Sequence, residues 1–473
     1  MKIFIKLLKY FSLMVCAFAI TSCEKLEEEP SNFMEPENFY TTPAQVESAF
    51  AASMNSLWVP WANYGYTMHT FNHDDQLAGG NLVIGNNHGS DLWAAHYSAI
   101  SNLNAAIKAI NNGNLEGTPQ EDINILMGQA KFLRAYNYFM LVRMFGPLPL
   151  ITEDNEDPYT AEIERSPLVD VYGLIENDLL EAFQKLPPSW PDAQKGRPTI
   201  DGAKGMLAKV YLTMATYPMN EPRYYQLAAD MAKQVIDAER YFLVEDVHQV
   251  FSVNAKYGPE MMFSFNSNYE DMATDPHIWT ELNGWGDFTA DILWTEKFPN
   301  QPRKDAYLEL ELDGESYLEL GRSPGIRKYL YDTDEDFNAG RSIVNIPILR
   351  FADVLLIYAE AANMANGGPT EGAVVAINKV IDRANGHVEN PEAPRATLDM
   401  TQAEFDTRVI EERNWELSFE FDRWFDLVRK RILKEESRED IQQNYSDDDL
   451  LFPIPENDLR LNPLLEQNPG YGL

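Results

Sequence analysis

Apolar residues recur at helical spacing along most of the chain, and this periodicity restricts the fold to a mostly helical one. Between residues 120 and 145, large apolar side chains return every three or four positions until Gly146 and Pro147 end the pattern, as at the end of a helix. A face repeated at this interval is normally buried against other elements. The periodicity predicts helices at 43–58, 89–112, 120–145, 168–186, 200–217, 223–239, 346–365, 370–385 and 403–433.

The predicted helices follow one another in pairs. Small and large residues are spaced within two of them much as in tetratricopeptide repeats, for example at Ala203, Leu207 and Tyr211; such repeats contain one helix pair per ~34 residues. The pairs stack because each buries its apolar face on its neighbour. We therefore expect a mostly α fold, namely a tetratricopeptide-like helical superhelix with a large irregular ligand-binding insertion.

Two segments break the helical pattern. Residues 60–90 and 241–345 are rich in aromatic, Gly, Pro, Asn and Asp residues, with only short strand-like pieces such as 261–265. Irregular segments of this length within a domain are usually functional. We therefore expect an N-terminal helical region at 41–240, an irregular ligand-binding insertion at 241–345 and a C-terminal helical region at 346–473.

The first 22 residues have the layout of a cleavable signal peptide. Three lysines precede an apolar stretch at 11–20, which is about half the ~20 residues that a helix needs to span a bilayer. The run Ile-Thr-Ser-Cys that ends at Cys23 resembles the lipobox of bacterial lipoproteins, so lipidation of Cys23 is expected. The other cysteine, Cys16, lies within the signal. The alternative is a plain secretory signal with an incidental cysteine.

Residues 23–40 are expected to form a lipidated tether. They begin with an acidic run at 24–29 that has too few large apolar groups to pack. Acidic runs at this place resemble the surface-export signal of lipoproteins in Bacteroidetes-like bacteria. The expected location is therefore the cell outer membrane, facing the exterior, with the lipid anchor as the only membrane contact.

The charge of the chain argues against nucleic acid as a partner. Loss of the signal would remove three lysines and no acid, which leaves 35 basic and 74 acidic residues. Binding to a phosphate backbone requires a basic stripe that displaces counterions, and here the basic residues are scattered among more numerous carboxylates. The same excess of negative charge favours a neutral ligand, although a local basic pocket can override the overall field.

Five strings along the chain carry a resemblance to a known family. They occur in the family's order, from the region after the lipobox to the last residues, and together they resemble the SusD/RagB family of nutrient-binding outer-membrane lipoproteins. The strings are FLRAY at 132–136 followed by FGPLPLI at 145–151, RFADVLLIYAEA at 350–361, ERNWELSFEFDRWFDLVR at 412–429, LFPIP at 451–455 and QNPGY at 467–471.

The resemblance implies both the fold and the biological role. It implies a tetratricopeptide-like superhelix with an irregular binding face, which sits as a lid on a SusC-like TonB-dependent transporter that imports glycans or, in some members, peptides. This chain departs from the family at three scaffold positions: the family often has Gly in place of Phe421, Arg in place of Ile381 and Arg in place of Val428. These departures affect the expected local packing more than the expected function.

The string at 412–429 is predicted to be structural. Its large aromatic residues fit one buried helical face, and Glu416, Glu420 and Arg423 are spaced to pair along that helix. Trp93 likewise has core spacing on its own helix.

Metal sites have weak support in the sequence. His69 and His73 form an HxxxH pair, but glycines flank them and no third ligand is evident. The alternation at 332–338 is similar to the start of a calcium loop, yet Phe337 and Ile343 replace the Gly and Glu that an EF-hand requires. We expect no cofactor, and a structural calcium ion stays open as an alternative.

Catalysis also has weak support. Asp74 and Asp75 are the kind of groups that a glycoside hydrolase uses, but among 74 acidic residues such pairs are common. Neither a P-loop nor a dinucleotide fingerprint is present. The chain is therefore expected not to be an enzyme, and a surface glycoside hydrolase is the least favoured alternative.

Glycan binding needs flat aromatic faces that stack on sugar rings and a few polar groups that fix orientation. Both irregular segments carry aromatic residues outside helical periodicity. Trp58 ends one apolar run and Trp294 lies in another, so both are expected in the core. Capture of a peptide is the alternative within binding proteins. The predicted ligand-binding residues are Trp61, Tyr64, Tyr66, His69, Asp74, Trp279 and Trp285.

Overall fold

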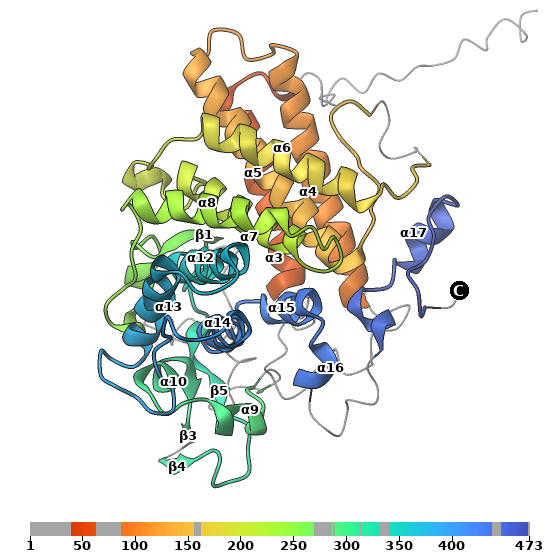
Figure 1. The fold of residues 1–473 in the computed structure, drawn as a ribbon. Helices are drawn as coiled ribbons and strands as arrows, with labels where there is room; N and C mark the ends of the chain where they lie inside the picture. The colour runs from red at the N-terminus through yellow and green to blue at the C-terminus, as the bar shows by residue number, and fades with distance from the viewer. Residues whose placement is uncertain are drawn as a thin grey trace, which may run out of the picture. The chain divides into compact units, whose positions relative to one another are not determined.

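The described part of the chain consists mainly of α-helices, as the periodicity predicts (Figure 1). The computed structural model describes residues 39–62, 87–155, 162–268, 286, 289–312, 314–330, 340–437 and 446–471. The long helices are α3 (Pro43–Ala62), α4 (Asn87–Asn111), α5 (Gln120–Phe145), α6 (Leu168–Lys185), α7 (Ile200–Ala215), α8 (Arg223–Asp237), α12 (Phe351–Asn366), α13 (Glu371–Ala384) and α14 (Gln402–Glu416). The short helices are α9 (Ile292–Lys297), α10 (Pro302–Tyr307), α15 (Arg423–Lys430), α16 (Leu433–Glu436) and α17 (Glu456–Leu461).

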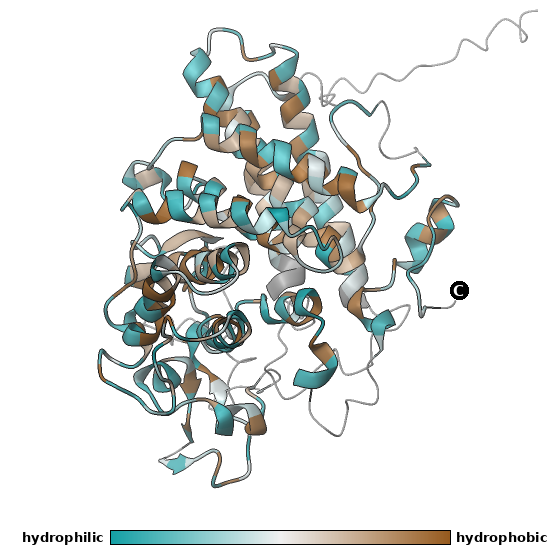
Figure 2. Cartoon of the chain, in the orientation of Figure 1, coloured by the Kyte–Doolittle hydropathy of each residue, from teal (hydrophilic) through white to brown (hydrophobic). Residues whose placement is uncertain are grey.

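Successive helices pack on one another from α3 to α8, and α8 then packs on α12. The intervening residues 238–350 thus leave the helical stack after α8 and return to it at α12. Helix α12 contacts α13 and α14, which continues the stack. Figure 2 shows that α8 and α12 each carry both hydrophilic and hydrophobic residues. Helix α8 buries its apolar face through residues such as Tyr225, Ala228 and Ala232. Stacking of amphipathic helices therefore builds the scaffold.

Side chains fix the beginnings of several helices. The hydroxyl of Thr199 accepts a hydrogen bond from the backbone N–H of Gly202 at the start of α7, and Thr370 does the same for α13. Helix α14 begins with a capping box formed by Thr401 and Glu404. Each such cap contributes about 1 kcal/mol.

Short strands tie the two ends of the inserted segment together. Strand β1 (Met261–Phe265) pairs antiparallel with β6 (Ile346–Arg350), which confirms the strand-like piece expected at 261–265. The sequence prediction of a helix from residue 346 was wrong at its start, because the first five residues form β6 and pair with β1, and the helix begins only at Phe351. The remaining strands are β2 (Leu308–Glu309) with β5 (Gly325–Ile326), and β3 (Glu311–Leu312) with β4 (Glu315–Ser316).

The single helix predicted at 403–433 is broken after α14. Phe419 and Phe421 have φ angles of 62° and 68°, which lie in the left-handed region and cannot continue a right-handed helix. At the second position the related family often has Gly, the residue that adopts this conformation without penalty. A phenylalanine there costs roughly 1–2 kcal/mol in backbone strain. Burial of both rings offsets that cost.

The expected pairing of Glu416, Glu420 and Arg423 along one helix was also wrong. Arg423 contacts Glu436 instead, whereas both glutamates are buried and contact cations from other elements. Five cations and four carboxylates form a connected group, which we call the buried ionic cluster: Arg303, Lys328, Arg350, Arg383, Arg408, Glu260, Glu412, Glu416 and Glu420.

The buried ionic cluster attaches the inserted segment to the scaffold. Arg303 on α10 reaches Glu416 of α14 at 2.8 Å, and Lys328 donates to Glu420 at 2.7 Å. Breaking a buried pair by removing one partner typically costs about 3–5 kcal/mol. The described parts of the inserted segment that carry Arg303 and Lys328 are therefore held firmly on the scaffold.

The strings that carry the family resemblance meet in space. The backbone N–H of Phe452 donates to the carbonyl of Met144 at 2.7 Å. The side-chain amide of Asn468 donates to the carbonyls of Phe145 and Phe452, at 3.0 and 2.7 Å. Segments more than 300 residues apart are thus joined through hydrogen bonds, which gives the strings at 145–151, 451–455 and 467–471 a structural role.

No helix among the described ranges combines the length and the apolar character needed to cross a membrane.

Candidate functional site

Most of the predicted binding residues fall outside the described ranges. Trp61 lies in the last turn of α3, which extends to Ala62 and is four residues longer than predicted. Tyr64, Tyr66, His69, Asp74, Trp279 and Trp285 lie outside the described residues, as do Cys23 and the calcium-loop-like run at 332–338. These assignments therefore stay predictions.

The two tryptophans assigned to the core do pack against the scaffold. Trp58 is 3% exposed, and its ring centroid lies 5.9 Å from that of Phe265 in β1. Trp294 is half-buried, with ring centroids 5.4 Å from those of Trp415 and Phe419. The assignment of Trp58 is confirmed, whereas Trp294 packs against the helices but is only half-buried. Both indoles link the inserted segment to the helices.

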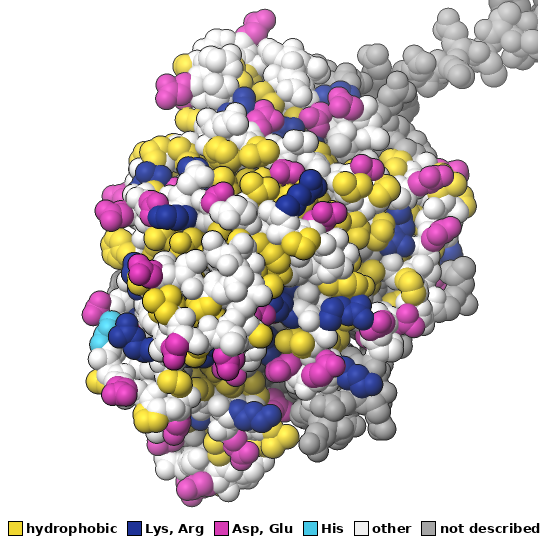
Figure 3. Space-filling view, in the orientation of Figure 1, with side chains coloured by type: hydrophobic (Ala, Val, Ile, Leu, Met, Phe, Trp, Pro, Cys, Tyr) yellow, Lys and Arg dark blue, Asp and Glu magenta, His cyan; other side chains and the backbone are white. Residues whose placement is uncertain are grey.

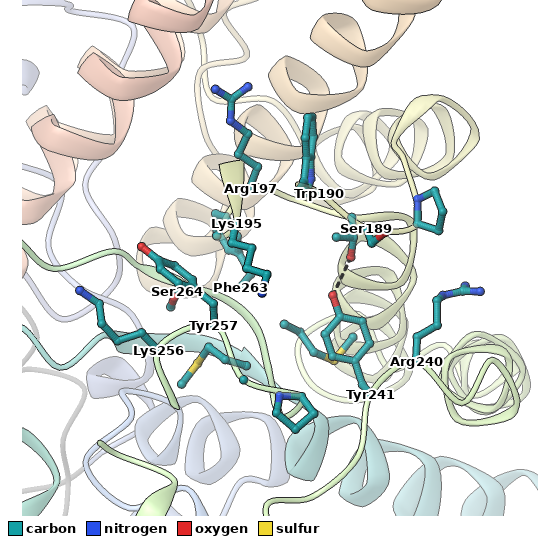
Figure 4. Close-up of a pocket in the computed structure, with 17 residues that line it drawn as sticks. Ser189, Trp190, Lys195, Arg197, Arg240, Tyr241, Lys256, Tyr257, Phe263 and Ser264 are labelled. Carbon is teal, nitrogen blue, oxygen red and sulfur yellow. Dashed lines mark hydrogen bonds between the residues drawn. The ribbon is translucent and has the colours of Figure 1, made fainter. Parts of the chain in front are cut away.

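A pocket of about 420 Å³ opens where two connecting segments face each other (Figure 4). One wall is the connection between α6 and α7, at 188–199, and the other is the segment at 240–264 that follows α8 and includes most of β1. The volume is within the range typical of small-molecule sites. The lining residues are Pro188, Ser189, Trp190, Lys195, Gly196, Arg197, Thr199, Arg240, Tyr241, Lys256, Tyr257, Gly258, Pro259, Met261, Met262, Phe263 and Ser264.

Local contacts hold the 188–199 wall in place. The indole Nε1 of Trp190 donates to the carbonyl of Pro198 at 2.8 Å, which closes the connection on itself. Gly196 has φ of 91°, and a Cβ there would lie 2.6 Å from the side chain of Asn266. The Asn266 amide donates to the carbonyl of Gly196 at 3.2 Å. A glycine is thus required where the two walls approach each other.

Aromatic and hydroxyl groups line the pocket between the walls. The hydroxyl of Tyr241 lies 3.0 Å from that of Thr199, the pair joined by the dashed line in Figure 4. Burial raises the pKa of Tyr241, so its phenol stays a neutral hydrogen-bonding group. Tyr257 is 42% exposed and leaves part of its ring open to solvent. A partly open ring beside fixed hydroxyls suits a ligand with both apolar faces and polar edges.

Four cationic side chains belong to the lining, and no Asp or Glu is among the lining residues that the structure describes. Arg240 is fixed by Asp201, which is fully buried and accepts two hydrogen bonds from the guanidinium at 2.5 and 2.7 Å. The guanidinium of Arg197 lies 5.3 Å from the ring centroid of Trp190. In Figure 4 the Arg197 side chain extends towards the top of the view beside Trp190, and the Arg240 side chain extends towards the right.

Sequence reasoning missed this pocket, although one signal was present. Trp190 stands outside helical periodicity in a connection rich in Pro and Gly, the criterion applied to the two longer irregular segments. Its partners at 240–264 lie about 50 residues away, and only the fold brings the two segments together.

A second hollow of about 520 Å³ lies between α4 and α17 and is lined by Trp93, Tyr97, Ile151, Leu461 and their neighbours. Its main polar groups are already satisfied: Trp93 Nε1 donates to Asp458 at 3.0 Å, and the Tyr97 hydroxyl donates to the carbonyl of Pro149 at 2.9 Å. The first pocket offers more groups for recognition of a polar ligand.

Catalytic and metal-binding arrangements find little support in the described ranges. No group of three or more His, Cys, Asp or Glu side chains there could hold a metal ion. Residues 321–325 match the G-x-S-x-G pattern of hydrolase nucleophiles. That motif requires its serine between a strand and a following helix, whereas Ser323 precedes the two-residue strand β5.

Comparison with known proteins gives the family. Residues 207–471, more than half of the chain, match the model of the SusD family. The chain belongs to the SusD family. Residues 20–212 also match a model described as "Starch-binding associating with outer membrane". The resemblance based on the five strings is thus confirmed.

Relatives of the SusD family align with this chain over nearly its whole length. SusD-like protein P2 of Formosa agariphila is 29% identical over 515 residues, covering 97% of this chain and 99% of the relative. A solved SusD homolog from Bacteroides thetaiotaomicron has a TM-score of 0.78 at 22% identity and covers 92% of this chain and 98% of that one. A laminarin-binding SusD-like protein has a TM-score of 0.75 at 21% identity, covering 91% and 100%. The structural likeness shows that the helical fold is shared.

Proposed function

We propose that this SusD-family protein captures a nutrient glycan at the cell surface without cleaving it and delivers it to a SusC-like TonB-dependent transporter. The observation that carries the proposal is the open pocket at 188–199 and 240–264, which combines aromatic and hydrogen-bonding groups on a SusD-type scaffold. The description of one structural relative as laminarin-binding supports glycan as the ligand class.

The lining chemistry agrees with the requirements of sugar recognition. A pyranose ring presents an apolar face, which stacks on an aromatic ring, and a rim of hydroxyls, which needs donors and acceptors. Tyr257 and Trp190 supply rings, and the hydroxyls of Tyr241 and Thr199 supply hydrogen bonds. Trp61, Trp279 and Trp285, together with the other predicted residues, stay predicted contributors to glycan binding.

The anchoring part of the proposal depends on the amino terminus and on one family description. Lipidation at Cys23 would hold the protein on the membrane, and residues 23–40 would let it reach outward. The phrase "associating with outer membrane" in the description of the matching family model supports this location. On the face shown in Figure 3, acidic and basic side chains are interspersed among other residues. That pattern agrees with a ligand other than nucleic acid.

Affinity electrophoresis tests glycan capture. The detergent-purified protein is run through gels that contain individual polysaccharides, with a peptide mixture as a parallel arm and serum albumin as a control. We expect retardation in at least one polysaccharide gel. Binding of peptides alone would replace the glycan by a peptide as the ligand, and release of new reducing ends would make the protein a glycoside hydrolase.

Delivery to a transporter has its own test. This chain, as a member of the SusD family, is proposed to act together with a SusC-like transporter. We expect it to co-purify with a TonB-dependent barrel when native outer membranes are dissolved in mild detergent. Isolation as a free monomer, with the neighbouring barrel gene expressed, would contradict this part of the proposal.

A further inference from the structure

We propose that the pocket between residues 188–199 and 240–264 binds an anionic group of the glycan, so that the substrate is an acidic glycan carrying uronate or sulfate groups. The inference rests on the proposed function, because it names the class of glycan that is captured. It starts from a local reversal of charge. The whole chain has 74 acidic and 38 basic residues, yet the charged residues in the lining are all basic.

The acidic partner of one of these cations does not hold it tightly. Lys195 contacts Asp192 at 2.8 Å, but the Asp192 side chain is 94% exposed. Exposed pairs of this kind contribute only about 0–1 kcal/mol. An anionic ligand can therefore take the place of Asp192 at little cost. Arg197 contacts Glu47 at 2.5 Å in a part-buried pair.

The other two cations are held in fixed positions. Lys256 Nζ donates to the backbone carbonyl of Ser267 at 2.5 Å, which tethers the ammonium beside the pocket. Arg240 is oriented by the buried carboxylate of Asp201, which raises the pKa of the guanidinium through its hydrogen bond. Two cations with tethered positions thus stand beside Lys195, whose carboxylate partner is exchangeable.

Cations and aromatic rings alternate around the pocket. Lys256 Nζ lies 5.9 Å from the ring centroid of Tyr257, and Arg197 lies beside Trp190. In Figure 4, Lys256 and Tyr257 lie at one side of the pocket and Trp190 with Arg197 at another. A sugar stacked on the Tyr257 ring would bring a charged substituent within reach of Lys256. Charge-assisted hydrogen bonds to such a group are about twice as strong as neutral ones.

The basic lining of the pocket revises the expectation of a neutral ligand. That expectation was based on the net charge of the whole chain, which governs the long-range approach of a ligand. At contact distance the nearest groups dominate, because salt at 0.1 M screens exposed charges beyond about 10 Å. The pocket is the local basic region that overrides the overall field.

Isothermal titration calorimetry with three matched probes tests the proposal. The detergent-purified full-length protein is titrated with hexamers of galacturonic acid, of sulfated galactose and of galactose. The pocket variant combines Lys195→Gln with Lys256→Gln. The control combines Lys233→Gln with Arg460→Gln, which changes the net charge equally at exposed sites outside the lining.

We expect at least one acidic hexamer to bind tenfold or more tightly than the galactose hexamer. The pocket variant should lose at least tenfold in affinity for that acidic hexamer, while the control stays within twofold and both variants keep the wild-type melting temperature. Preference for either acidic hexamer supports the proposal and identifies the anion as carboxylate or sulfate.

Three results would overturn it: equal or tighter binding of the neutral hexamer, unchanged binding of the acidic hexamer by the pocket variant, or binding of none of the hexamers. The proposed function has a separate outcome. If a neutral polysaccharide retards the protein in affinity gels while the acidic hexamers fail, glycan capture stands and the acidic class falls.

Discussion

Replacing Glu416 with Gln should destabilise the protein strongly, because this carboxylate is the centre of the buried ionic cluster. It is fully buried and accepts hydrogen bonds from Arg303, Arg350 and Arg383 at 2.8, 3.0 and 2.6 Å. Burial alone would raise the pKa of Glu416, but the three arginines outweigh it and hold the pKa well below the usual range. The variant keeps the shape of the side chain and removes only its charge, so the cluster gains one uncompensated positive charge.

The magnitude follows from the burial of the pair and the size of the folded unit. Loss of one partner of a buried ion pair costs about 3–5 kcal/mol. The entropy of unfolding is about 2.1 cal/mol/K per residue, so for a unit the size of Tyr40–Leu473 the melting temperature should fall by roughly 3–5 °C. Differential scanning calorimetry measures this shift.

The matched control is Glu411→Gln, which removes an exposed carboxylate from the same helix and should shift the melting temperature by less than about 1 °C, as surface substitutions usually do. Equal melting temperatures for Glu416→Gln and the wild type would refute the view that the buried ionic cluster holds the inserted segment on the scaffold.

Three further predictions concern acid stability, the aromatic residues and the anchor. Burial would raise the pKa of Glu360, but Arg429 outweighs it and lowers that pKa to about 2. The resulting stability is present above the unfolded pKa near 4.5 and is lost as pH falls towards 2, on the order of 3 kcal/mol, which melting curves between pH 6 and 2.5 will reveal. Trp93→Ala should cost about 3–5 kcal/mol of folding free energy, because its ring packs 4.9 Å from that of Phe145, whereas Trp279→Ala should leave melting unchanged and weaken glycan binding about thirtyfold, as calorimetry would show. Cys23→Ser should remove the acyl anchor and shift the protein from the membrane to the soluble fraction, as measured by fractionation without the transporter.

The helices could be predicted from the sequence because large apolar residues recur at helical spacing between recognisable end signals. Residues 120–145 illustrate this, since both ends of the predicted helix agree with α5, although most of this helix is buried on all sides. The break after α14 could not be predicted, because it depends on Phe419 and Phe421 adopting positive φ angles. A glycine at position 421 would have indicated the break, whereas the phenylalanine found there gives no such indication.

Long-range electrostatics escaped prediction for a related reason. Spacing along the chain offers only local partners, so Glu416 and Arg423 were assigned to the same helix. In the structure Glu416 pairs with cations that lie 33 to 113 positions away in sequence. The pocket could not be predicted for the same reason, because its two walls belong to different connections between helices. The chemistry of each wall was visible in the sequence, but their meeting was not.

The most direct test of glycan capture is to follow a bound glycan through a complete cycle of binding and release. A fluorescently labelled polysaccharide that retards the protein in affinity gels is incubated with it overnight, released by excess unlabelled ligand and sized by chromatography. We predict that the label returns at its original size, with a binding stoichiometry that stays constant over time. Recovery of shortened chains, or the absence of any retarding polysaccharide from a broad panel of neutral and acidic ones, would contradict the assignment of this SusD-family protein as a glycan-capturing protein.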